Sequence, residues 1–163
     1  MARRWKKYLN SNKTPFDCQL VTAINAYYYL TGKTIPQNSD QYDEFVKIAK
    51  CDHGAAIGIE KIWKKLNLKV IKKSRTLLDI QIEGSRLSSK TPLPIEWRIW
   101  HKKTGFHSTL IVDECKKTQC FRVTNFKDVT SVRGWIFKED MYMYSYPLGS
   151  KDYVCFKLFG LKK

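Results

Sequence analysis

Residues 16–33, FDCQLVTAINAYYYLTGK, place one cysteine at the start of an apolar segment. Asp17 is a good N-cap residue directly before Cys18, and Gly32 is a good residue to end a helix. Apolar side chains recur at the three- and four-residue spacing of a helix with one buried face, namely Leu20, Ala23, Ile24, Tyr27 and Leu30. The stretch therefore predicts a helix over residues 18–31 that begins at Cys18.

The rest of the chain divides into a helical first part and a strand-rich second part. Two further helices are predicted over residues 40–50 and 57–67. Beyond residue 68 the apolar period changes to two, in stretches at residues 93–100, 106–113, 120–126, 142–146 and 152–159. Short turns such as HKKTG and ECKKTQ favour antiparallel neighbours. The order of elements predicts an α+β fold, with helices packed on a mostly antiparallel sheet.

The length of 163 residues, with 43% hydrophobic side chains, suits a single domain over residues 1–163. Residues 1–11 form a basic N-terminal arm whose flexibility is left open. No apolar run reaches the length that crosses a bilayer. The basic N-terminus lacks the apolar stretch of a secretion signal. We therefore expect no transmembrane segment and no secretion by that route.

The five cysteines cannot all pair within one chain, and their spacing lacks the dense framework of a small secreted domain. The sequence therefore predicts reduced thiols in a reducing compartment, either the cytoplasm or a virion. One alternative is a zinc site, with the candidate ligands Cys51, His53, Cys115 and Cys120. The spacing within neither pair matches the common zinc motifs, so we expect no metal and no cofactor.

The charge balance is strongly basic. Thirty Lys and Arg residues against fifteen Asp and Glu residues give a net charge of +15. A field of this sign attracts polyanions such as nucleic acid, an anionic membrane face or an acidic protein. The alternative is that the excess lysine only keeps the protein in solution. The candidate polyanion contacts form the two densest basic clusters: Arg3, Arg4, Lys6, Lys7, Lys64, Lys65, Lys72 and Lys73.

Cys18 has the position of a reactive cysteine. The N-terminus of a helix lowers the pKa of a thiol and so favours the nucleophilic thiolate. Such a thiolate also needs a base, usually histidine, and a group that orients the base. If residues 106–126 form a simple hairpin about Lys116, His107 faces Asn125 across the two strands. The alternative is that Cys18 is a structural thiol in the core.

The candidate residues follow one another as a cysteine at the start of a helix, a histidine on a strand and an asparagine on the next strand. This order resembles that of the catalytic residues in the papain-like cysteine peptidases. The resemblance is specifically to the small bacteriocin-processing peptidases of ABC exporters. It is carried by DCQLVTAINAYYYL (17–30), GAAIGIEKIWKKLNLKV (54–70) and GFHSTLIVDE (105–114). These short motifs extend the resemblance over about residues 10–130. The resemblance implies a papain-like fold in which the cysteine helix packs on the sheet.

The resemblance also implies site residues for acyl transfer to Cys18 from a protein or peptide substrate. His107 would move the proton and Asn125 would orient His107. Asn12 stands where the family has a glutamine six residues before the cysteine, so its side chain would help to bind the oxyanion. The family's glycine after the cysteine is replaced by Gln19. The third catalytic residue, often aspartate in the family, would be Asn125.

Three functions remain open on the sequence alone. The first is a cysteine peptidase that cleaves a peptide or isopeptide bond. The second is an acyltransferase or deamidase that uses the same cysteine and histidine. The third is a papain-like fold with weak or no catalysis, which serves as a basic, nucleic-acid-associated component, for example of a virus particle. The sequence does not indicate the oligomeric state.

Overall fold

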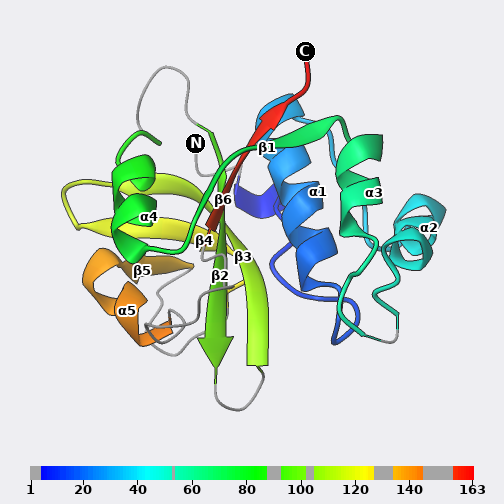
Figure 1. Cartoon of the computed structure of the whole chain (residues 1–163), viewed down its shortest axis with the longest axis horizontal. Coiled ribbons are helices and arrows are strands. Elements are labelled where there is room, and N and C mark those ends of the chain that lie inside the picture. Colours follow the sequence, from blue (N-terminus) through cyan, green and yellow to red (C-terminus); the bar gives the residue numbers. More distant parts are fainter. Residues whose placement is uncertain (1–4, 53, 88–92, 102–104, 127–133, 145–155) are drawn as a thin grey trace.

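The computed structural model shows a six-stranded antiparallel sheet with helices on both sides (Figure 1). It describes residues 5–52, 54–87, 93–101, 105–126, 134–144 and 156–163. The predictions for Arg3, Arg4 and His53 therefore lie outside the described residues, as do parts of the predicted strands at 142–146 and 152–159. The α+β class predicted from the order of elements is confirmed.

Five α-helices are described: α1 (Cys18–Thr31), α2 (Asp40–Ala49), α3 (Ile59–Lys65), α4 (Leu77–Gly84) and α5 (Met141–Tyr144). Two short 3-10 helices, η1 (Trp5–Lys7) and η2 (Lys138–Asp140), precede α1 and α5. The first three α-helices confirm the helices predicted in the first part of the chain. In the described part of the chain, no helix has the length and apolar character needed to cross a membrane.

The sheet contains β1 (Leu68–Ser74), β2 (Ile95–His101), β3 (Gly105–Cys115), β4 (Cys120–Thr124), β5 (Trp135–Phe137) and β6 (Phe156–Leu161). Their order is β1-β6-β2-β3-β4-β5, and every neighbouring pair is antiparallel. The C-terminal strand β6 therefore lies inside the sheet, between β1 and β2. Because β5 borders β4 and β2 borders β3, the β3–β4 pair is held from both sides.

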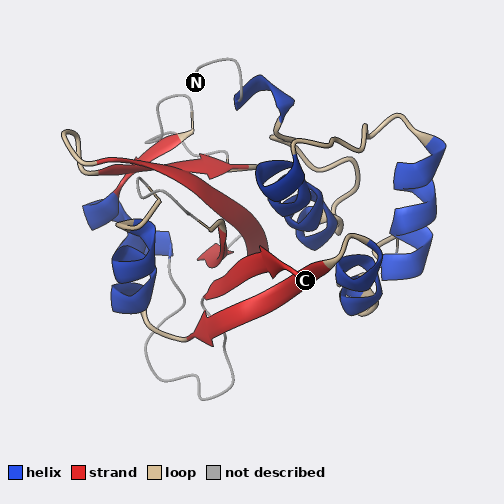
Figure 2. Ribbon diagram, turned by 90° about the horizontal axis from the view of Figure 1, so that it is seen from above, coloured by secondary structure: helices blue, strands red, loops and turns tan. Residues whose placement is uncertain are grey.

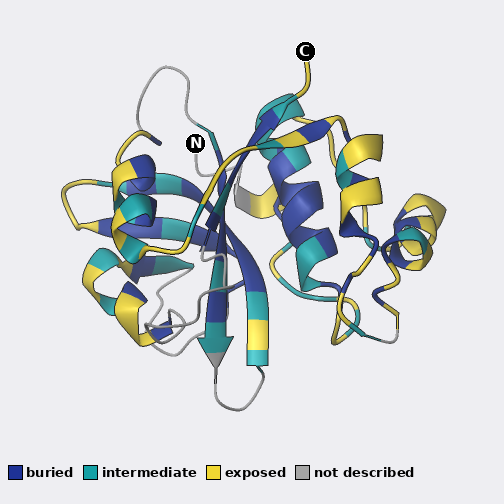
Figure 3. Ribbon diagram, in the orientation of Figure 1, coloured by how far each residue is buried: buried dark blue, intermediate teal, exposed yellow. Residues whose placement is uncertain are grey.

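The two faces of the sheet bury separate hydrophobic clusters. Helices α1, α2 and α3 cover one face, and α4 and α5 cover the other (Figure 2). Side chains of β3 alternate between the clusters, since Leu110 and Val112 join the α1 side while Ile111 joins the α4 side. Helix α1 is buried over most of its length, whereas α2 and α3 expose their outer sides (Figure 3).

Helix α1 begins and ends where the sequence predicts. Gly32 adopts a left-handed conformation with φ 74°, and its N–H donates to the Tyr28 carbonyl at 2.8 Å. Asp17 precedes the helix, but its side chain makes no capping hydrogen bond to the first turn. The carboxylate of Asp17 is instead bound to Lys13 and Tyr42. Asp17 is therefore the N-cap residue by position, as the sequence predicts, but its side chain serves the loop before α1 and not the helix.

Two helices in the second part of the chain were not predicted. Helix α4 begins after Thr76, whose hydroxyl accepts a hydrogen bond from the Asp79 N–H at 3.2 Å. Helix α5 replaces the start of the strand expected at 142–146. In this stretch almost every residue is apolar, so the sequence shows no alternation of apolar and polar positions that would distinguish a helix from a strand. The burial of Met141 and Tyr144, three residues apart, reveals the helical period.

The β3–β4 hairpin has a different register from the prediction. Ile111 pairs with Val123, and Cys115 pairs with Cys120 across a turn of four residues. The predicted pairing of His107 directly with Asn125 is therefore wrong. The turn causes the shift, because it spans residues 116–119 and is centred after Lys117 instead of on Lys116; Gln119 ends it with a positive φ of 55°. The irregularity between Ile111 and Asp113 then changes the register by one residue, back towards the predicted one.

Candidate active site

Cys18 is the first residue of α1 and lies half-buried against β3. Backbone N–H groups of Ser108 and Gln19 are hydrogen-bonded to its sulfur. One turn further along α1, the Thr22 hydroxyl accepts a hydrogen bond from the Ser108 hydroxyl at 2.9 Å. Both contacts hold the start of α1 against the residue that directly follows His107 in the chain.

The pKa of Cys18 is not lowered, in contrast to the expectation from its position at the start of a helix. Burial raises the pKa of Cys18, and the negative charge of Glu96 raises it further. The N–H groups of Ser108 and Gln19, and the positive charge of Arg98, act in the opposite direction. Burial is the largest of these effects. The resting form of Cys18 is therefore the neutral thiol.

His107 lies in β3, close to its beginning, and contacts Asn125. The Nε2 atom of His107 is 2.7 Å from the backbone carbonyl oxygen of Asn125. Because a carbonyl oxygen only accepts, Nε2 carries the proton and donates this hydrogen bond. Nδ1 of the neutral ring is then the atom that can accept a proton. The hydrogen bond therefore selects one tautomer of a potential base.

The protonation of His107 depends mainly on its burial, which lowers the pKa of the imidazole. The hydrogen bond to the Asn125 carbonyl and the negative charge of Asp17 both favour the charged ring and partly offset the burial. At neutral pH the imidazole is uncharged. Cys18 and His107 are thus both neutral at rest.

Asn125 follows β4 and has a positive φ of 51°. Its side-chain Nδ2 donates to the Asn12 Oδ1 at 2.7 Å, and its backbone N–H donates to the Asn10 Oδ1 at 3.4 Å. The structure therefore brings His107, Asn125 and Asn12 together. The contact to His107 differs from the predicted one, since the carbonyl of residue 125, and not the asparagine side chain, holds the ring.

Asn12 keeps the capacity to donate a hydrogen bond. Its contact with Asn125 uses the acceptor atom Oδ1, which leaves the Nδ2 group for another partner. An amide donor is what the predicted role at an oxyanion requires. The backbone segment that carries Asn12 is fixed by Asn25, a buried residue of α1 that the sequence analysis did not single out.

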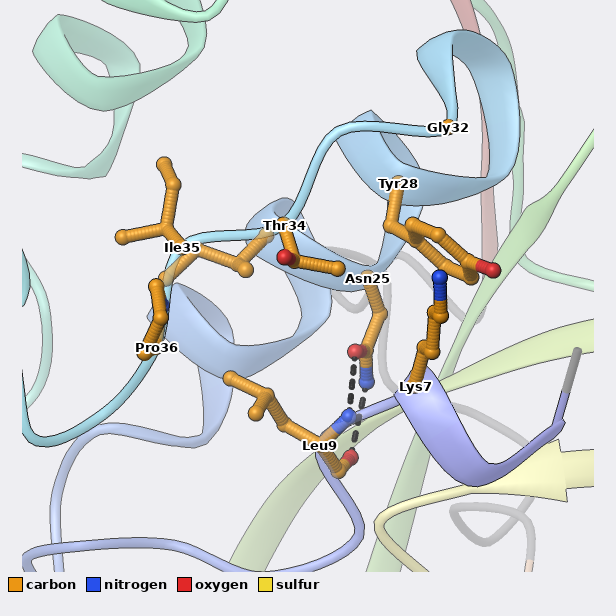
Figure 4. A pocket seen from close by; sticks show the side chains of 9 residues that line it. Lys7, Leu9, Asn25, Tyr28, Gly32, Thr34, Ile35 and Pro36 are labelled. Atoms are coloured by element: carbon orange, nitrogen blue, oxygen red, sulfur yellow. Dashed lines mark hydrogen bonds between the residues drawn. The ribbon is translucent and has the colours of Figure 1, made fainter.

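Asn25 ties three segments together. Its Oδ1 accepts from the Leu9 N–H at 2.8 Å, and its Nδ2 donates to the Leu9 carbonyl at 2.9 Å (Figure 4). The same Nδ2 donates to the Thr124 hydroxyl, at the end of β4, at 3.0 Å. Residues 8–11 of the predicted N-terminal arm therefore belong to the fold. These contacts also border a pocket of about 290 Å³, whose lining includes Lys7 and Tyr28.

Asp17 anchors the loop between Asn12 and Cys18. The carboxylate is fully buried, and its Oδ2 accepts from the Lys13 N–H at 3.0 Å and from the Tyr42 hydroxyl at 2.5 Å. Gln37 donates to the carbonyl of Ser11 at 2.9 Å. Helix α2 and the segment before it therefore hold the loop that ends at the cysteine. The acidic residue directly before Cys18 is visible in the sequence, but its role in holding this loop is not. Its partner Tyr42 lies 25 residues further along the chain, so no local pattern predicts the contact.

The candidate zinc ligands do not form a cluster in the described part of the chain. Cys51 is buried among α1, α2 and α3, and burial, followed by the charge of Asp17, raises the pKa of its thiol to about 11. Cys115 and Cys120 face each other at the β3–β4 turn. Among the described residues, no three His, Cys, Asp or Glu side chains gather in a way that could hold a metal ion.

The predicted polyanion contacts divide between elements. Lys6 and Lys7 lie in η1, and Lys64 and Lys65 lie at the end of α3. Lys73 is exposed on β1. Its neighbour Lys72 is bound to Glu83 of α4, with its Nζ 3.2 Å from Oε1. Lys72 is therefore partly neutralised, whereas the lysines of α3 have other lysines as neighbours.

No family model matches the chain, and no curated protein is similar to it. The geometry of the site is therefore the ground on which a function is proposed.

Proposed function

We propose that this chain is a papain-like cysteine peptidase that cleaves a peptide or isopeptide bond. One observation carries the proposal: the 2.7 Å hydrogen bond from His107 Nε2 to the Asn125 carbonyl, with Cys18 bound to the next residue of the same strand. A nucleophile, a base in a defined tautomer and an amide donor then lie on neighbouring segments. The proposal extends to the papain-like arrangement of the fold.

The proposed reaction begins with both groups neutral. The Cys18 sulfur attacks the substrate carbonyl carbon while its proton passes to Nδ1 of His107. The N–H of Cys18 and the Nδ2 of Asn12 bind the oxyanion. When the intermediate collapses, the C–N bond breaks and His107 returns the proton to the leaving amine. Water then attacks the thioester with His107 as the base, which releases the acid and restores the thiol.

The experiment that tests this function measures cleavage of a mixed peptide library, with new N-termini identified by mass spectrometry. Cys18→Ala should abolish cleavage, and His107→Ala should lower the rate by about 10²- to 10⁴-fold, the usual loss when a general base is removed. Cys115→Ala, which changes a thiol at the distant β3–β4 turn, is the matched control and should keep the parent rate. Cleavage that survives Cys18→Ala would refute the proposal.

The role of the Asn125 backbone can be separated from that of its side chain. Glycine tolerates the φ of 51° at this position and keeps the carbonyl that holds His107, whereas alanine is strained there by about 1 kcal/mol. Both substitutions remove the hydrogen bond to Asn12. Asn125→Gly should therefore keep more activity than Asn125→Ala. Equal and complete loss of activity in both would mean that the side chain itself is the orienting group.

The raised pKa of Cys18 also supports a second candidate function, in which the chain binds a partner without efficient catalysis. Burial raises the pKa of Cys18, which favours a basic binding component with weak or no turnover. Such a component would give no cleavage in the library experiment, for the parent and for Cys18→Ala alike. An acyltransferase or deamidase would instead show Cys18-dependent product, either a new amide or released ammonia, without new N-termini.

A further inference from the structure

A groove between α2 and α3 is surrounded by lysines. It has a volume of about 620 Å³, and its lining consists of one apolar residue, Ile48, and five lysines: Lys47, Lys50, Lys61, Lys64 and Lys65. All five lysines are exposed. Only Lys64 and Lys65 belong to the basic clusters that the sequence predicts as polyanion contacts. The groove arises because the fold brings two separate segments of the chain, 47–50 and 61–65, side by side.

The groove exists because α2 and α3 approach closely at one glycine. The N–H of Gly58, the residue before α3, donates to the carbonyl of Ala49 at the end of α2, at 3.0 Å. This hydrogen bond aligns the last turn of α2, with Lys47 and Lys50, beside the lysine-bearing side of α3. On α3, Lys61 lies three residues before Lys64 and four before Lys65, a spacing that places side chains about 5–6 Å from each other. Lys47 lies in the last turn of α2, and Lys50 directly follows that helix.

Within the described part of the chain, no ion pair neutralises the lysines of the groove. Glu44 and Glu60 lie on the same two helices, yet none of the five lysines has a carboxylate within ion-pair distance among the described residues. Five like charges around one concavity repel each other, and an anion that enters it relieves this repulsion. The net charge of +15 adds a long-range attraction for the same ligands.

We propose that the α2–α3 groove binds the phosphate backbone of a nucleic acid strand. A strand carries closely spaced charges that can follow two rows of ammonium groups into a groove, whereas a vesicle surface is flat and cannot enter it. Lysine binds phosphate as a point charge and does not read bases. The groove therefore binds nucleic acid without sequence preference. This function goes beyond the peptidase chemistry and does not depend on Cys18.

The test measures binding of a fluorescent single-stranded oligonucleotide, about 20 nucleotides long to exceed one typical binding site, by anisotropy at several salt concentrations. The groove variant carries Lys61→Ala, Lys64→Ala and Lys65→Ala. The matched control carries Lys69→Ala, Lys117→Ala and Lys163→Ala, three exposed lysines outside the groove, with the same change in net charge. Alanine at these α3 positions favours the helix, so the fold is retained, and circular dichroism checks this.

The groove variant should bind about a hundredfold more weakly at about 0.1 M salt, and its slope of log affinity against log salt should fall by about 2, at about 0.7 for each phosphate that the variant no longer neutralises. The control should weaken much less, and Cys18→Ala should bind like the parent. Equal weakening in the groove variant and the control would overturn the proposal, because the overall field would then be the cause. Groove-dependent binding of anionic vesicles or of polyglutamate, with none to the oligonucleotide, would overturn it as well.

Discussion

At the scale of single residues, three thiols of the chain differ in environment. Hydrogen bonds to Thr118 lower the pKa of Cys115 at its exposed turn. Burial raises the pKa of Cys18, and burial with the charge of Asp17 raises that of Cys51 to about 11. Since the thiolate is the reactive form, these directions place Cys115 before the other two thiols, and the half-buried Cys18 comes before the fully buried Cys51.

We therefore predict that, of these three thiols, iodoacetamide at neutral pH labels Cys115 first, Cys18 next and Cys51 last, as read by peptide mapping. This order reverses the expectation, from helix position alone, that Cys18 is the most reactive thiol. The rate at Cys18 should keep rising with pH beyond the ordinary thiol pKa, because burial stabilises the neutral form. A Cys18 rate that already reaches a plateau below neutral pH would instead indicate a preformed thiolate–imidazolium pair.

The acid side of the pH dependence is set by His107. Its pKa in the folded chain is lowered by burial, so the ring stays neutral to a pH below its ordinary value of about 6.5. Between the folded pKa and about 6.5 the unfolded chain binds more protons, so the stability that this group contributes is full above about pH 6.5 and is lost as pH falls through the folded value. Cleavage activity, measured over the same pH range, should follow the same direction.

At the scale of elements, the close contact of α2 and α3 depends on a missing side chain. A Cβ atom at Gly58 would lie 2.2 Å from the carbonyl oxygen of Ile48, a backbone atom that cannot move without α2. A Cβ atom at Gly54, four residues earlier, would meet nothing within 4 Å. The two glycines thus form a matched pair for measuring the cost of the contact.

We predict that Gly58→Ala lowers the free energy of unfolding by about 2 kcal/mol or more, as expected for a steric overlap in a packed contact. Gly54→Ala should change it by less than about 0.5 kcal/mol. Urea unfolding followed by circular dichroism measures both. If Gly58→Ala were as stable as Gly54→Ala, the close packing of the two helices would not be supported.

The elements also show what the sequence could and could not predict. Helix α1 was predictable because its start, buried face and terminal Gly32 are local signals. The hairpin was predictable as an element, but its register depended on Gln119 and on an irregularity near Val112, which no residue pattern marks. The contact of Asn125 with Asn12 joins residues 113 positions apart, so no local signal could have placed it.

At the scale of the whole molecule, net charge and ion pairs oppose each other. The charge of +15 destabilises the compact state by self-repulsion, most strongly at low salt. Against it, buried carboxylates hold cations: Glu96 binds Lys157 with its Oε1 3.0 Å from Nζ, and Glu114 binds Lys138. Salt screens charges exposed at the surface more than it screens pairs that are largely buried.

Added salt should therefore weaken the repulsion between surface charges more than it weakens the attraction within the buried ion pairs. We predict that raising NaCl from about 0.02 M to about 0.5 M raises the melting temperature by roughly 3–6 °C, which corresponds to about 1–2 kcal/mol for a chain of this size. The groove variant with three lysines replaced by alanine has less repulsion and should show a smaller rise. General effects of salt on hydrophobic burial act equally on both proteins and cancel in the comparison. A melting temperature that falls with salt would mean that attractive ion pairs outweigh the repulsion. An equal rise in both proteins would mean that the lysines of the α2–α3 groove do not contribute to it.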